Sequence, residues 1–206
     1  RGVVSDDAYI RAGHWGRGPM PSLRWSVEGK TIGILGLGRI GRTLAAKLQA
    51  FGCEVLYHGR RPQPDQPYEY CADLTAMARR AKALILTCPG GPATAGIVTR
   101  EVIDALGPEG FLINVARGEV VDEVALIAAL QEGRLGQAAL DVFAEEPHVP
   151  EALRALPNVI LTPHVASATV ETRGAMFNLC ADNVRSWFAS GRALTPVPEQ
   201  EGWAPA

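Results

Sequence analysis

The chain has 206 residues, of which 47% are hydrophobic and 20% charged. These fractions are typical of a folded globular protein, and the length suits one large domain with appendages. The formal net charge of −2 argues against a nucleic-acid or membrane-surface partner, because both require concentrated positive charge. No apolar run is long enough to cross a bilayer, and no signal-peptide pattern opens the chain.

Four cysteines are spread along the chain without a Cys-x-x-Cys pair. This spacing predicts reduced thiols and a cytoplasmic location, and no metal site is predicted. Cys88 has no His or other base beside it in sequence. We therefore expect Cys88 to pack as a small apolar residue.

Residues 1–29 come first and are rich in Gly, Arg, Pro and Trp. Because no hydrophobic periodicity runs through them, we predict an irregular arm or linker that enters the following domain from elsewhere. The arm carries several large apolar side chains, among them Trp15 and Trp25. Such side chains favour contact with a second subunit, and the alternative is that the arm folds back on its own domain.

From Lys30 to Thr162, apolar β-branched runs alternate with segments of helical periodicity. Asp73 and Asp122 are predicted helix N-caps. The predicted strands are 31–35, 54–57, 83–87, 110–115, 137–142 and 159–161, and the predicted helices are 39–51, 73–80, 99–106, 122–133 and 169–189. This alternation predicts an α/β fold, a Rossmann-type doubly wound parallel sheet with an N-terminal arm and a long C-terminal helix. The predicted domains are 1–29, 30–168 and 169–206.

A glycine-rich loop, Gly36-Leu-Gly38-Arg39-Ile40-Gly41, follows the first predicted strand and opens the first helix. Gly36 permits a tight turn, Gly38 lets a pyrophosphate approach the backbone, and Gly41 lets helix and strand pack closely. The helix N-terminus favours the ligand's negative charge. Although glycines also serve simple turns, the strand-loop-helix context predicts dinucleotide binding.

The end of the second strand, His58-Gly59-Arg60-Arg61, distinguishes NADP from NAD. NAD enzymes usually carry an acid there that binds the ribose 2′-hydroxyl. That acid is absent, and two arginines offer charge-assisted bonds to a 2′-phosphate. We predict NADP(H) as the preferred cofactor, with NAD as the alternative; the competing interpretation is that both arginines are solvated loop charges.

Three polar residues follow later strands, where open α/β sheets bind ligands. Arg117 follows the strand 110–115, Glu146 follows 137–142 in a turn with Glu145, and His164 follows 159–161. Each alone is compatible with an ordinary turn or surface charge. Together they supply a cation for a carboxylate, a histidine that exchanges a proton near neutral pH, and a carboxylate that supports it.

Several motifs occur together in a fixed order: the glycine loop, Asn114 to Gly118, Asp141-Val-Phe with Glu146-Pro147, and Thr162-Pro163-His164. In this the chain resembles the D-isomer-specific 2-hydroxyacid dehydrogenases from about residue 11 to residue 196. The segment 88–94 is similar to that of the glyoxylate/hydroxypyruvate reductase branch. One departure is Ala166, where the family often has glycine.

The resemblance implies an NADPH-dependent oxidoreductase that reduces a small 2-keto acid, such as glyoxylate or hydroxypyruvate, to the D-2-hydroxy acid. It implies that Arg117 binds the carboxylate or carbonyl oxygen, that His164 is the acid, and that Glu146 supports His164. We expect Asn114 to hold its loop or the cofactor. Cofactor contacts are further implied for Cys88, Pro89, Thr94, Val115, Ala116, Arg117, Asp141, His164 and Ala166.

Proteins of this family have two lobes, and we expect that the first, substrate-binding lobe lies outside this chain. We expect this part alone to turn over poorly. A phosphoglycerate-type dehydrogenase is disfavoured because the ribose-binding acid is missing, and a formate dehydrogenase because its reaction needs no proton from a Glu-supported His. The alternative from another class is a dinucleotide-sensing module of the corepressor type. The expected partners are the 2-keto acid and a second copy in a homodimer.

Overall fold

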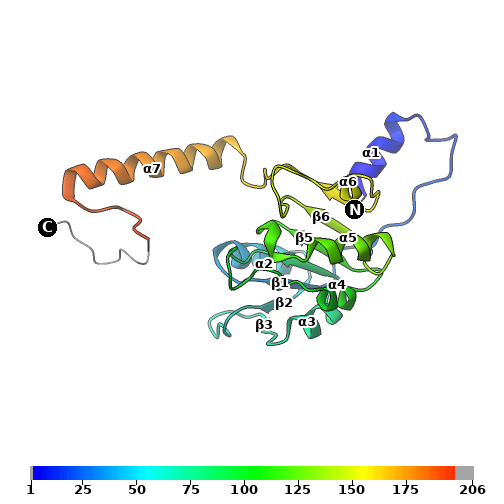
Figure 1. Ribbon diagram of the computed structural model, residues 1–206, viewed down its shortest axis with the longest axis horizontal. Helices are drawn as coiled ribbons and strands as arrows, with labels where there is room; N and C mark the ends of the chain where they lie inside the picture. The colour runs from blue at the N-terminus through cyan, green and yellow to red at the C-terminus, as the bar shows by residue number, and fades with distance from the viewer. Residues whose placement is uncertain (1, 198–206) are drawn as a thin grey trace. The chain divides into compact units, whose positions relative to one another are not determined.

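In the computed structural model, residues 2–197 are described, and the chain divides into two compact units, Arg1–Pro163 and His164–Ala206. The first unit contains a seven-stranded sheet of order β3-β2-β1-β4-β5-β6-β7, with every neighbouring pair parallel. The strands are β1 Thr31–Leu35, β2 Glu54–His58, β3 Glu69–Tyr70, β4 Ala83–Leu86, β5 Phe111–Asn114, β6 Gln137–Leu140 and β7 Val159–Leu161. Figure 1 shows this sheet with its helices.

Helices cover both faces of the sheet. The helices of the first unit are α1 Val3–Arg11, α2 Arg39–Ala50, α3 Leu74–Arg80, α4 Arg100–Leu106, α5 Glu123–Gln131 and α6 Glu151–Arg154, with a 3-10 turn Gly118–Val120. One buried apolar cluster joins α3, α4 and α5 to strands β1, β4, β5 and β6. Smaller clusters join α2 to the opposite face. The predicted doubly wound α/β fold is confirmed.

The long C-terminal helix α7, Val170–Ser190, belongs to the second unit. Its bounds agree with those of the predicted helix 169–189 within one residue at each end. The Thr169 hydroxyl caps it by accepting from Thr172 N–H. The predicted caps Asp73 and Asp122 are also confirmed, since each carboxylate accepts a backbone N–H in the first turn of its helix. Within residues 2–197, no helix is both long and apolar enough to cross a membrane.

The prediction of an irregular arm over residues 1–29 is wrong for Val3–Arg11, which form helix α1. This helix buries none of its residues. Polar contacts support it instead: Arg11 pairs with Asp7 at 2.8 Å, and Arg24 pairs with Asp6 at 3.0 Å. Hydrophobic periodicity therefore gave no signal of it.

The end of the arm folds back on its own domain. The Trp25 ring meets the Phe111 ring edge-on at a centroid distance of 4.8 Å, and Lys82 lies 5.5 Å from the Trp25 centroid. Trp15 remains 70% exposed. The fold-back alternative therefore holds for Trp25 and not for Trp15.

Candidate functional site

The glycine loop joins the carboxyl end of β1 to the start of α2. Gly36 has φ +99°, and a Cβ there would lie 2.7 Å from backbone atoms of Cys88. A Cβ on Gly41 would lie 2.2 Å from the Gly36 carbonyl oxygen. Gly38 caps α2, and among residues 2–197 no atom beyond its own chain neighbours lies within 4 Å of its Cβ position. The loop thus leaves an open approach to the free N–H groups of the helix, where an anion is favoured.

The carboxyl end of β2 lies beside the glycine loop, because the Gly36 N–H donates to the His58 carbonyl at 2.9 Å. The Tyr70 hydroxyl holds the next residue, donating to the Gly59 carbonyl at 3.2 Å. A cavity of about 630 Å³ opens here, lined by the predicted residues Gly38, Arg39, Arg60 and Arg61. Within residues 2–197, none of these three arginines forms an ion pair. The cavity is suited to a phosphate-bearing ligand.

The same cavity includes residues that the sequence interpretation missed: Arg42, Gln63 and Asp65. Arg42 lies three residues after Arg39 in the first turn of α2, and this spacing places two side chains on one helix face. That spacing was a usable signal. Gln63 and Asp65 belong to a proline-rich loop whose path no periodicity predicts.

The loop 88–94 begins where β4 ends and lies against the glycine loop through Cys88. Cys88 is buried, as expected for a small apolar residue, and this burial raises the pKa of its thiol. The Thr94 hydroxyl donates to the Pro89 carbonyl at 2.7 Å. The Gly91 N–H donates to Glu119 Oε1 at 2.6 Å. These bonds fix the loop at the carboxyl edge of the sheet.

Arg117 stands on a turn that Asn114 holds. The Asn114 side chain, 1% exposed, donates to the Arg117 carbonyl and accepts from Ala116 N–H, each at 3.0 Å. Asn114 therefore holds its loop, one of its two predicted roles. A Cβ on Gly90 would lie 2.7 Å from Arg117 Cγ, so the loop 88–94 and Arg117 are in close contact. Val115, between Asn114 and Ala116, is 37% exposed.

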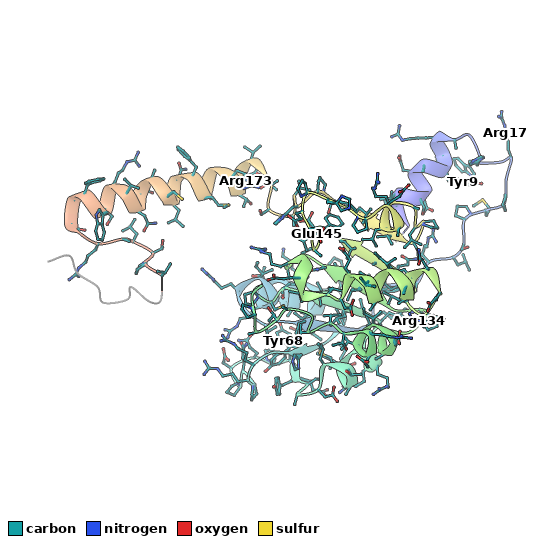
Figure 2. All side chains as sticks on the ribbon, in the orientation of Figure 1. Tyr9, Arg17, Tyr68, Arg134, Glu145 and Arg173 are labelled. Carbon is teal, nitrogen blue, oxygen red and sulfur yellow. The ribbon has the colours of Figure 1, made fainter. Side chains whose placement is uncertain are left out.

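Asp141 and Glu146 lie after β6. Asp141 is 5% exposed and accepts from the Thr162 hydroxyl at 2.6 Å. Glu146 Oε1 accepts from Phe143 N–H at 3.1 Å. Figure 2 labels the neighbouring Glu145.

The turns that carry Arg117 and Glu146 pack against each other. A Cβ on Gly118 would lie 2.0 Å from backbone atoms of Phe143, so Gly118 allows this contact. The carboxyl ends of β5 and β6 are also joined by the Asp141 N–H, which donates to the Asn114 carbonyl at 3.0 Å. Arg117, Asp141 and Glu146 therefore share one edge of the sheet.

His164 begins the second unit, directly after Pro163. Its φ of +53° is uncommon for a residue with a side chain, and such backbone positions concentrate at functional sites. Ala166 belongs to the same unit. The predicted association of these two residues with Arg117 and Glu146 stays a prediction. Among residues 2–197, no group of three or more His, Cys, Asp or Glu side chains is placed to hold a metal ion.

Comparison with known proteins agrees with this geometry. Residues 1–166 match the family described as "D-isomer specific 2-hydroxyacid dehydrogenase, NAD binding domain". The chain is 49% identical over 197 residues to glyoxylate/hydroxypyruvate reductase A HPR2 of Arabidopsis thaliana, covering 96% of this chain and 63% of that protein. It is 46% identical over 197 residues to 2-ketogluconate reductase of Gluconobacter oxydans, with the same coverage.

A solved structure is similar over the whole chain: the NADPH-dependent glyoxylate/hydroxypyruvate reductase of Sinorhizobium meliloti, in complex with NADP and malonate. Its TM-score is 0.94 at 46% identity, covering 100% of this chain and 65% of that one. The chain thus spans slightly less than two thirds of the length of these relatives. From the family match and these identities, the chain belongs to the D-isomer-specific 2-hydroxyacid dehydrogenases, of which it contains the NAD-binding domain.

Proposed function

We propose that the protein reduces a small 2-keto acid with NADPH and yields the D-2-hydroxy acid, with glyoxylate and hydroxypyruvate as the favoured substrates. The cavity that holds Arg39, Arg60 and Arg61 beside the glycine loop carries this proposal. It joins an open helix N-terminus with unpaired cations, the combination that a 2′-phosphorylated dinucleotide needs. The S. meliloti relative, described as NADPH-dependent, supports the same cofactor.

The chemistry divides among Arg117, Glu146 and His164. When bound, NADPH supplies the hydride that forms the new C–H bond at the carbonyl carbon. Arg117 binds the substrate carboxylate and orients the carbonyl. His164 delivers a proton to the carbonyl oxygen, and Glu146 accepts a hydrogen bond from the other imidazole nitrogen and stabilises the charged ring. Hydride and proton together convert the carbonyl group to a hydroxyl group.

Cofactor choice is tested by NADPH and NADH titrations of the full-length protein and of an Arg60→Ala, Arg61→Ala double variant. Loss of the 2′-phosphate contacts is expected to weaken NADPH binding by roughly 100-fold and NADH binding by about twofold or less. Equal weakening of both cofactors would overturn the assignment. The control is Arg79→Ala, which removes an arginine that does not line the cavity.

The second candidate function is the dinucleotide-sensing module, because a shared fold does not establish turnover. The relatives reported above are named as reductases, and this favours reduction. NADPH oxidation by the full-length protein with a panel of 2-keto acids separates the two functions. Tight NADPH binding without turnover of any 2-keto acid would support the sensor.

We further propose that residues 1–29 connect to a substrate lobe, that residues 30–168 bind the cofactor, and that 169–206 return toward that lobe. We also propose a cytoplasmic homodimer. The exposed Trp15, Met20 and Leu23 support an interface on the arm. Light scattering that gives the mass of a monomer at micromolar concentration would contradict the dimer.

A further inference from the structure

Gln63 fastens the proline-rich loop to the glycine loop. Its side-chain amide donates to the Leu37 carbonyl at 3.0 Å, inside the glycine loop. Its backbone N–H donates to the Tyr57 hydroxyl at 2.7 Å, and Tyr57 is only 1% exposed. The loop that follows Arg60 and Arg61 is therefore attached to both the core and the glycine loop.

Arg42 completes this attachment from helix α2. Its Nε and Nη2 donate to Gln63 Oε1 at 3.1 and 2.5 Å, and its Nη1 pairs with Asp65 Oδ2 at 3.2 Å. All three nitrogens of the guanidinium group are thus engaged. Arg42 differs in this from Arg39, Arg60 and Arg61, which form no ion pair within residues 2–197.

Asp65 would be unfavourable in this cavity on its own. Its pKa lies below the usual range, chiefly because the Gln66 side chain donates to it and in part because of Arg42. The carboxylate is therefore ionised at neutral pH and adds a negative charge to a wall that would face a phosphate. The pairing with Arg42 offsets this charge and leaves the three unpaired arginines for an anion.

We infer that Arg42 is a specificity-determining positioning residue, which neutralises Asp65 and holds the Arg60–Asp65 loop so that the cavity accepts a 2′-phosphate. This inference rests on the proposed NADPH preference. It assigns Arg42 a role separate from direct phosphate binding. It also explains how an acidic residue is tolerated in an anion site.

The test measures the adenosine end alone, by calorimetric titration of the full-length protein with 2′,5′-ADP and with 5′-AMP, which lacks the 2′-phosphate. Arg42→Met is expected to weaken the binding of 2′,5′-ADP about tenfold and the binding of 5′-AMP less than about twofold. Asp65→Asn is expected to strengthen 2′,5′-ADP about threefold. The double variant is expected to recover most of the loss, because the unpaired carboxylate is gone.

Each result bears on the inference. If the double variant binds 2′,5′-ADP as weakly as Arg42→Met does, then Arg42 does not act by neutralising Asp65, and the inference is overturned. Equal weakening of both ligands by Arg42→Met would show a merely structural role, and would also overturn it. Wild type that binds both ligands equally would instead refute the NADPH preference itself. Arg185→Met is the matched control, since it removes an exposed arginine paired with Asp182 on α7.

Discussion

Gly90 lies where a side chain would disturb the proposed substrate-binding arginine. An added Cβ would lie 2.7 Å from Arg117 Cγ and 2.8 Å from Glu119 Oε1. Gly90→Ala must therefore displace Arg117. We expect kcat/KM for glyoxylate to fall roughly 10- to 100-fold in the full-length protein, because small misplacements of positioning groups are costly. Steady-state kinetics measure this.

The matched control is Gly174→Ala on α7, where, among residues 2–197, no atom outside the adjacent backbone of that helix lies within 4 Å of the added Cβ. This control separates the effect of the methyl group at Gly90 from a general effect of replacing a glycine. Unchanged kcat/KM in Gly90→Ala would contradict the contact between the loop 88–94 and Arg117.

The cysteines differ in their environment. Burial raises the pKa of the Cys88 thiol, so less thiolate is present at any pH below that pKa. Cys180 is exposed. We expect iodoacetamide to alkylate Cys180 at least about tenfold faster than Cys88 near neutral pH, and the Cys88 rate to keep rising at higher pH than for an ordinary thiol. Peptide mass spectrometry of the folded 206-residue chain measures both rates, and equal rates would contradict the burial of Cys88.

At the scale of elements, the start of helix α3 depends on one carboxylate. Asp73 accepts from the N–H groups of Thr75 and Ala76 at 2.8 and 3.1 Å. Asp73→Ala is expected to lower the free energy of unfolding by about 1 kcal/mol, whereas Asp73→Asn keeps an acceptor and should lose much less. Urea unfolding measures the difference. Equal stability of the alanine variant and the wild type would show that the cap is dispensable.

The sequence was sufficient for the elements with a strong apolar pattern. Strands β1, β2, β4, β5, β6 and β7 were predicted within two residues at each end, because each carries a short β-branched or apolar run. Strand β3 and helix α6 have two and four residues, too few for any period to register. Helix α1 was missed because charge pairs, not an apolar face, support it.

The candidate site followed the same rule. Arg60, Arg61 and Arg117 were predicted because they lie within three residues of the ends of strands, and the carboxyl ends of parallel strands meet at one edge of the sheet. Gln63 and Asp65 were not predicted as site residues, because their position depends on how their loop folds against helix α2, which is distant in sequence. Tertiary contacts of this kind leave no local pattern.

At the scale of the whole molecule, the chain spans 63% of the length of its curated relatives. We expect the 206-residue chain to bind NADPH but to reduce glyoxylate at least about 100-fold more slowly than a protein with the full length of these relatives, because closure between two lobes orients substrate and excludes water. Binding and steady-state assays of the two proteins side by side measure this. Equal turnover by the 206-residue chain would contradict it.

The place of β1 in the sheet has a consequence for synthesis. β1 is made before the other six strands of this sheet, yet it lies between β2 and β4, and β4 begins some fifty residues later at Ala83. The backbone that encloses Gly36 comes from Cys88, just beyond β4. A nascent chain emerging from the ribosome therefore carries the glycine loop long before its neighbours can shape it. The most local motif in the sequence therefore meets its final surroundings only after Cys88 has been made, because the contact between them is non-local.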